Sequence, residues 1–218
     1  MTALGLAEAG FAGSAGTRPR LPEAERRQAL IRVAENVFLA QGYAAANMDD
    51  VARGARMSKK TLYQIFSSKE ALFEAVMTDH LAPLLVVTPE EAEADLREGL
   101  TALLERAATH LLDERHVGIF RLISAEVKRT PELAEAFHRA GPARGEGALE
   151  RCLAVHAASG RLHIADTAVA AGMLFGLAIG EPHMRMILGQ REAPTAEEIS
   201  ARVAKAVDIF LNGTLVRD

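Results

Sequence analysis

Apolar residues recur at intervals of three and four positions along nearly the whole chain after residue 19, and no segment alternates apolar and polar residues as a β-strand does. This spacing lines apolar side chains along one face of a helix, which must then pack against other helices. Proline and glycine separate the helical segments. The sequence therefore predicts an all-α fold of about nine helices.

Several helix ends are marked by residues with known preferences. We expect Pro22 to lie in the first turn of the first helix and Gly42 to end that helix. Asn47 has a side chain that caps helix N-termini, and we expect a new helix to begin there. Asp166 and Thr195 are the expected caps of two later helices, and we expect a break at Pro182.

Composition restricts the environment of the protein. A single cysteine, Cys152, excludes an internal disulfide framework and is typical of a reducing cytoplasm. No apolar run reaches the length of about 18 residues that a membrane span needs, and the first residues do not resemble a secretory signal. We expect a cytoplasmic protein with no membrane partner. Residues 1–19 are rich in glycine, alanine and serine, which predicts a flexible N-terminal arm.

The formal net charge of −4 hides an uneven distribution of charge. Residues 1–70 carry ten basic and seven acidic side chains, so the acidic excess lies in the rest of the chain. From Val51 to Lys69 there are five basic residues and no acidic one. A confined basic patch on an acidic protein indicates a surface that binds a polyanion, with a solvated helix surface as the alternative.

The segment Met48–Phe66 has the pattern of a helix-turn-helix. Ala52 is small enough to sit where two short helices approach closely, and Ser58 can cap the second helix. The inward-facing apolar positions are Val51, Ala55, Met57, Leu62 and Ile65. An ordinary helical hairpin is the alternative, but a hairpin that needs only solubility would mix its charges.

The exposed face of the second short helix carries side chains that suit a DNA major groove. They are Lys59, Lys60, Thr61, Tyr63 and Gln64. Lysines can contact phosphate or guanine, threonine and glutamine can contact base edges, and tyrosine can contact phosphate. This face therefore predicts binding to double-stranded DNA.

Residues 28–73 resemble the DNA-binding domain of the TetR/AcrR family of bacterial regulators. The matching residues are Ala34, Phe38, Gly42, Tyr43, Met48, Asp49, Val51, Ala52, Met57, Ser58, Lys59, Thr61, Leu62, Tyr63, Phe66, Ser68, Lys69, Glu70, Leu72 and Phe73. The resemblance implies that Thr61, Tyr63 and Lys69 contact DNA, and that the helix start at Asn47 and Met48 points at a phosphate. It also implies a DNA-binding domain over residues 20–68 and an effector-binding and dimerisation domain over residues 69–218.

Arg56 departs from the family pattern, which usually has glycine at this position of the turn. That position commonly adopts a left-handed conformation, which costs a non-glycine residue about 1–2 kcal/mol. Our hypothesis is that Arg56 contacts the DNA backbone in return. Whether the basic residues near the arm, Arg18 and Arg20, reach a minor groove is left open.

A dimer is expected because two-fold proteins gain affinity by binding two half-sites. The resemblance places the dimer interface on the last two helices, where small and apolar residues are frequent. The candidate interface residues are Ala168, Gly172, Phe175, Gly176, Ile179, Val203, Val207 and Phe210. For each of them, burial in the core of a single chain is the alternative.

The segment from Phe120 to Arg144 resembles the C-terminal domain of AefR-type members of the family, which implies an effector cavity between helices. The candidate lining residues are Phe120, Ile123, Met173, Phe175 and Met184, with His110, His138 and His183 as polar groups. The identity of the effector does not follow from these residues.

The sequence thus predicts a homodimeric transcription regulator, a repressor that an unknown small-molecule effector releases from a palindromic operator in the bacterial cytoplasm and nucleoid. A helical enzyme would need convergent titratable groups, and an adaptor that binds only protein would not need the basic run. Cys152 and His156 lie one helical turn apart, but two ligands do not make a metal site. We expect no catalytic residues, no cofactor and no metal.

Overall fold

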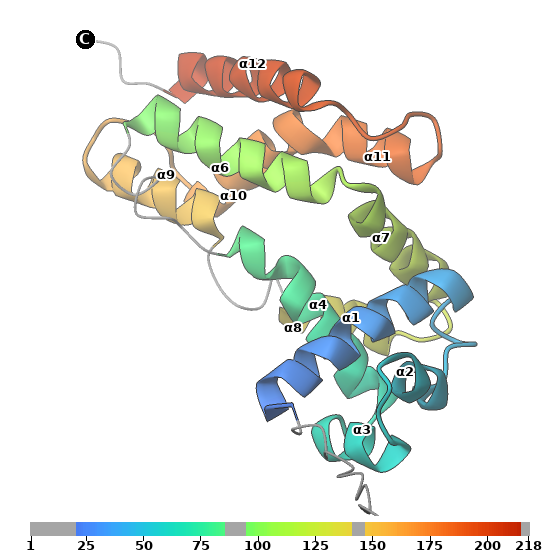
Figure 1. Ribbon diagram of the computed structural model, residues 1–218. Helices are drawn as coiled ribbons and strands as arrows, with labels where there is room; N and C mark the ends of the chain where they lie inside the picture. The colour runs from blue at the N-terminus through green and yellow to red at the C-terminus, as the bar shows by residue number, and fades with distance from the viewer. Residues whose placement is uncertain (1–20, 86–94, 141–146, 215–218) are drawn as a thin grey trace, which may run out of the picture.

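The computed structural model describes residues 21–85, 95–140 and 147–214, and these residues form an all-α fold without β-strands, as predicted (Figure 1). The elements are α1 (Glu23–Gln41), α2 (Met48–Gly54), α3 (Lys59–Ile65), α4 (Lys69–Leu81), η1 (Ala82–Leu84), α6 (Leu96–Leu111), α7 (Glu114–Glu126), α8 (Glu132–Ala140), α9 (Ala148–Ala158), α10 (Thr167–Phe175), η3 (Gly176–Gly180), α11 (Glu181–Ile187) and α12 (Ala196–Thr214). The predicted arm over residues 1–19 lies outside the described residues. Among the described helices, none combines the length and apolar character needed to cross a membrane.

The predicted caps at Asn47 and Asp166 are confirmed by their hydrogen bonds, whereas Pro22 lies just before α1 and not in its first turn. The Asn47 side chain accepts a hydrogen bond from the backbone N–H of Asp50 at 2.8 Å, and Asp166 accepts one from Val169 at 2.9 Å. Gly42 ends α1 with φ of 78°, a left-handed conformation that glycine adopts without strain. The helix boundaries therefore follow from local side-chain chemistry.

The break expected at Pro182 takes a different form. α10, η3 and α11 follow one another without a loop, and η3 is a π-helical segment. Proline has no N–H to donate, so the helix adjusts its hydrogen bonding in the turn before Pro182 instead of ending.

Buried apolar residues form two clusters at opposite ends of the molecule. The first is built by α1 to α4 with parts of α7 and α8, and it contains the contacting rings of Phe38, Tyr43 and Phe73. The second is built mainly by α6 and α9 to α12. Figure 1 shows the two groups of helices with α4 and α7 between them. α4 packs with the first cluster along its length, and its last residue, Leu81, reaches the space between the two clusters.

The α1–α2 contact depends on Gly54, which the sequence analysis did not single out. A Cβ atom at Gly54 would lie 2.6 Å from Cγ1 of Val33 on α1. This separation is too short for two carbon atoms, so any larger residue at position 54 would force the Val33 side chain or one of the two helices to shift.

Candidate functional site

α2 and α3 form a capped unit whose inner side is fully packed. Ala52 and Leu62 are buried, at 3% and 0% exposure. The Ser58 hydroxyl accepts a hydrogen bond from the Thr61 backbone N–H at 3.0 Å and contacts the Thr61 hydroxyl at 2.8 Å. The N-terminus of α3 is therefore held by the predicted cap, and the hydroxyl of Thr61 is engaged in it.

The outer face of α3 presents four exposed side chains: Lys59, Lys60, Tyr63 and Gln64. They belong to the set that the sequence analysis assigned to the DNA surface. Tyr63 is 45% exposed, although large aromatic side chains are usually buried. The structure thus brings these polar groups together on one short, rigid helix.

The basic run is free of acids along the chain, but it is not free of acids in space. Lys59 Nζ lies 2.8 Å from Asp49 Oδ1, and Arg53 lies 3.2 Å from Asp50. The Lys59–Asp49 pair is exposed, so it contributes little to stability and its carboxylate can be exchanged for another anion. In the second pair Arg53 is exposed, whereas Asp50 is partly buried. Asp49 and Asp50 directly precede the basic run in the sequence, so a count that begins at Val51 does not include them.

Arg56 has the left-handed conformation predicted from the family pattern, with φ of 55°. It is the one non-glycine residue with positive φ among the described residues. The Arg56 N–H bonds to the Arg53 carbonyl at 3.0 Å and the Met57 N–H to the Ala52 carbonyl at 2.9 Å, which is the Schellman arrangement that ends a helix. Its side chain is exposed beside α3 in the turn.

Lys69, for which the family resemblance implies a contact with DNA, has a structural role within the chain. Its ammonium donates hydrogen bonds to the carbonyls of Tyr43, Ala44 and Ala46 at 2.9, 3.3 and 3.1 Å. It also lies 4.5 Å from the centre of the Tyr43 ring. Lys69 therefore ties the start of α4 to the α1–α2 connection.

The two residues at the start of α2 have different roles, because one caps the helix and the other is buried in the core. Asn47 is exposed and its side chain serves as the cap, whereas the Met48 side chain is 8% exposed and belongs to the first cluster. Any contact of Met48 with DNA is therefore restricted to its backbone. The predicted phosphate contact at this helix start stays a prediction.

A cavity of about 490 Å³ opens between the two clusters, with a wall of leucine and phenylalanine side chains. Phe120, Phe175 and His183, three of the predicted lining residues, lie in its wall. Phe137 and His116 also line it and were not predicted, because α7 and α8 bring them to the cavity from positions with no local sequence signal. A largely apolar cavity of this size suits a small organic ligand.

The other predicted lining residues lie elsewhere. Ile123 is buried in the first cluster, and His138 is exposed on α8. Met173 and Met184 are 65% and 55% exposed, so both point away from the cavity. α10 is apolar on all sides, and its sequence therefore could not show which face is turned inward. His110 lines a separate polar pocket.

Two histidines in the cavity wall are held in the uncharged form. Burial and the neighbouring imidazoles of His80, His110 and His183 lower the pKa of His116 to about 3. Burial also lowers the pKa of His183, whose Nε2 is buried without a hydrogen-bond partner. His183 thus brings an unpaired, buried polar atom into the apolar wall of the cavity.

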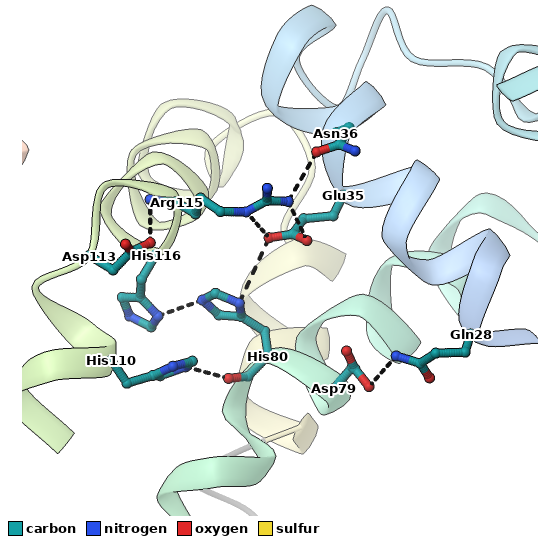
Figure 2. A network of polar contacts seen from close by, with 9 residues as sticks. All are labelled: Gln28, Glu35, Asn36, Asp79, His80, His110, Asp113, Arg115 and His116. Carbon is teal, nitrogen blue, oxygen red and sulfur yellow. Dashed lines mark hydrogen bonds and ion pairs between the residues drawn. The ribbon is translucent and has the colours of Figure 1, made fainter. Parts of the chain in front are cut away.

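A polar network connects this region to α1 (Figure 2). His80 at the end of α4 contacts His116 Nδ1 through its Nε2 at 2.6 Å. On its other side, His80 Nδ1 lies 4.0 Å from the Glu35 carboxylate. Arg115 donates two hydrogen bonds to Glu35 at 2.8 and 3.2 Å. α1, α4 and α7 therefore meet through side chains that are polar and specifically paired.

Comparison with known proteins identifies both halves of the chain. Residues 30–76 match the family model for bacterial regulatory proteins of the tetR family. Residues 98–213, more than half of the chain, match the model for the C-terminal domain of AefR-like transcriptional repressors. The chain belongs to the TetR family.

Relatives of this TetR-family chain are transcription regulators. The transcriptional activator FasR of Mycolicibacterium smegmatis is 43% identical over 88 residues, which are 39% of this chain and 40% of FasR. The repressor BepR of Brucella suis is 26% identical over 129 residues, which are 56% of this chain and 60% of BepR. The chain thus spans about half the length of the curated relatives it matches.

Solved structures extend the similarity over nearly the whole chain. A TetR-family regulator from Mesorhizobium loti is 26% identical with a TM-score of 0.77, and it covers 90% of this chain and 100% of that one. The flavonoid-responsive regulator FrrA is 30% identical with a TM-score of 0.70, covering 89% and 100%. Fold and relatives therefore connect the chain to transcription regulation.

The predicted dimer residues of this TetR-family chain fall into two groups. Ala168, Gly172, Phe175 and Gly176 are exposed on α10 and η3. The second group, Ile179, Val203, Val207 and Phe210, is buried in the second cluster and packs within the chain. The exposed group alone is available for contact with a second chain.

Proposed function

We propose that this protein is a dimeric repressor that binds a two-fold DNA operator through α2 and α3 and is released by an apolar effector. The observation that carries the proposal is the outer face of α3, where Lys59, Lys60, Tyr63 and Gln64 project from a rigid, capped helix. Such a helix fits the major groove, where these side chains can contact base edges and phosphates. The match to the AefR-like repressor domain favours repression, although the relatives include an activator.

The electrostatics of α2 and α3 suit an interface that exchanges partners. Lys59 is paired with Asp49 in an exposed ion pair, and phosphate can replace this carboxylate at small cost. Arg56 is exposed in the turn, where its guanidinium can contact the DNA backbone. DNA binding through these groups should weaken with rising salt concentration.

The dimer is supported by glycines that packing within the chain does not require. A Cβ atom at Gly172, Gly176 or Gly180 would meet nothing within 4 Å. These glycines follow one another at every fourth position, which places them on one face of the helix. Val169 and Met173 extend this surface with side chains that are 51% and 65% exposed. A second copy approaching closely would explain both the missing side chains and the exposed apolar ones.

The dimer is tested by Gly176→Leu, which adds a bulky side chain to this face. We expect the variant to be monomeric by size-exclusion chromatography with light scattering, because the helices could no longer approach closely. Operator affinity should then fall by at least about tenfold, since one half-site alone is bound. Ala125→Leu, on an exposed position of α7, is the control that should stay dimeric. A dimeric Gly176→Leu variant would contradict this interface.

The effector is expected to be a mostly apolar molecule with one hydrogen-bonding group for His183 Nε2. The wall supplies phenylalanine and leucine side chains, and this imidazole nitrogen is buried without a partner. An aromatic phenol satisfies both requirements, and the similar protein FrrA is flavonoid-responsive. A flavonoid is therefore the first probe for this cavity.

α4 is the proposed connection between the cavity and DNA binding. Its last residue, Leu81, lines the cavity, and its first residue, Lys69, is bonded to the α1–α2 connection. A ligand that displaces Leu81 would shift the whole rigid helix and with it the position of α2 and α3. The two recognition helices of a dimer would then no longer match the spacing of the half-sites.

The test is operator affinity measured by fluorescence anisotropy with and without a flavonoid that calorimetry shows to bind. We expect affinity to fall by about 5- to 150-fold when the ligand is saturating, which is the usual range of allosteric coupling. A ligand that binds in the cavity and leaves operator affinity unchanged contradicts the proposed coupling.

A further inference from the structure

Three histidines from three helices meet next to the cavity. His80 lies near the end of α4, His110 near the end of α6 and His116 near the start of α7 (Figure 2). One imidazole nitrogen from each lies within 4.8 Å of the others. Neither the proposed DNA contact nor the proposed effector contact uses this arrangement.

The surrounding hydrogen bonds orient the three rings. His110 Nε2 lies 2.6 Å from the backbone carbonyl of His80, and because a carbonyl only accepts, Nε2 carries the proton. This leaves Nδ1 of neutral His110 with its lone pair. His80 Nδ1 faces the carboxylate of Glu35 at 4.0 Å, which favours a proton on Nδ1 and a lone pair on Nε2. A carboxylate or carbonyl behind an imidazole, as His80 and His110 have, is typical of histidines that ligate metal ions.

We propose that His80, His110 and His116 bind a divalent transition-metal ion, with zinc as the ion that three imidazoles suit best. Zinc sites with three histidines and one open position are a known coordination type. Tetrahedral Zn–N bonds of about 2.1 Å separate the ligand nitrogens by about 3.4 Å. His80 Nε2 and His116 Nδ1 are now 2.6 Å apart, so the rings need to part by less than about 1 Å.

The charged groups around the three histidines favour a cation. The polar pocket beside His80 and His110 contains the carboxylates of Glu35, Asp79 and Asp113. It also contains the guanidinium groups of Arg106 and Arg115, and Arg115 is already paired with Glu35. This pocket gives an ion access from solvent to His80 and His110, which both line it.

A hydrogen-bonded stack of histidines without any ion is the competing account. The stack explains the 2.6 Å contact between His80 and His116 equally well. It does not account for the third imidazole, that of His110, which also brings a nitrogen within 4.8 Å of the other two. Direct measurement of ion binding separates the two accounts, and it is independent of whether the protein binds an operator or an organic effector.

The experiment titrates chelator-treated full-length protein with Zn²⁺ by calorimetry and with Co²⁺ by visible absorption. We expect one ion per chain and the intense d–d absorption of cobalt in a tetrahedral site. His110→Gln keeps a donor for the His80 carbonyl but should lower zinc affinity by on the order of 100-fold, and Glu35→Gln by about 10-fold. His138→Gln, an exposed histidine on α8, is the control and should bind as the unmodified protein does.

Thermal unfolding followed by circular dichroism checks that each variant is folded. His80→Gln is the second ligand variant if His110→Gln is not folded, because His80 lies at the end of α4. The site is overturned if the unmodified protein gives no stoichiometric binding and no cobalt spectrum. It is equally overturned if a folded His110→Gln or His80→Gln variant binds zinc with unchanged affinity.

Discussion

The helix-turn-helix end and the cavity end of the molecule place their polar side chains in opposite ways. On α3, Lys60, Tyr63 and Gln64 are exposed on a helix whose inner side is fully packed. At the cavity, the imidazoles of His116 and His183 are turned into an apolar wall and kept uncharged by burial. The first arrangement suits contact with a charged polymer in water, and the second suits recognition of a small molecule removed from water. α4 belongs to both ends and connects them.

We expect the largest difference between the two ends from a variant that combines Lys60→Ala with Tyr63→Ala. Each side chain projects from the outer face of α3, so neither loss should affect packing. We expect operator affinity to fall by on the order of 100-fold, since specific contacts contribute about 1–3 kcal/mol each. Ligand binding at the cavity and the urea midpoint should not change. Lys128→Ala, on an exposed lysine beyond α7, is the matched control; an equal loss in that variant would mean that α3 has no special role.

The corresponding change at the cavity end is His183→Leu. The variant removes the unpaired Nε2 and keeps the apolar wall. We expect affinity for a phenolic ligand to fall about tenfold, which is the loss of one hydrogen bond in an apolar site. Operator affinity without ligand should stay unchanged. If calorimetry shows the same ligand affinity for His183→Leu and the unmodified protein, the polar group of the ligand binds elsewhere.

Lys69→Met tests the junction between α4 and the helix-turn-helix. The variant keeps the stem over the Tyr43 ring but removes the ammonium from three backbone carbonyls. We expect the free energy of unfolding, measured with urea, to fall by about 2 kcal/mol, because hydrogen bonds from charged groups contribute more than neutral ones. Lys60→Ala is the control with no such bonds. Unchanged stability together with weaker DNA binding would contradict the structural role. It would support the direct contact of Lys69 with DNA that the family resemblance implies.

Arg56→Gly is expected to have the smallest effect and the opposite sign. Glycine adopts the left-handed conformation without strain, so the free energy of unfolding should rise by about 1 kcal/mol. If Arg56 also contacts a phosphate, the salt dependence of operator binding should decrease by about one unit of slope per chain. If the variant is more stable but the salt dependence of operator binding is unchanged, Arg56 is strained in the turn and does not contact DNA.

The two ends also differ in how far the sequence predicts them. Caps such as Asn47, Ser58 and Asp166 act over three residues, so their hydrogen bonds could be predicted from neighbours along the chain. The left-handed conformation of Arg56 could be predicted for the same reason. Most of the α2–α3 unit could therefore be predicted from residues that are close together in the sequence.

The cavity could be predicted only in part, because its wall is made by helices far apart in sequence. Met173 and Met184 were expected in the wall but are exposed, since α10 and α11 have apolar residues on more than one face. His116 was missed because its partner His80 lies 36 positions away. Contacts of this kind depend on how the helices pack against one another. The spacing of apolar residues along the sequence does not predict that packing.

The most direct test of the central claim is the affinity of the purified protein for duplexes selected from a random pool. The selected duplex should contain a two-fold sequence, bind on the order of 1,000-fold more tightly than a scrambled duplex, and lose affinity steeply between low and moderate salt. The same selected duplex should bind the variant that combines Lys60→Ala and Tyr63→Ala about 100-fold more weakly. Equal affinity for selected and scrambled duplexes, or no enrichment of any sequence, would contradict the claim that α2 and α3 recognise an operator.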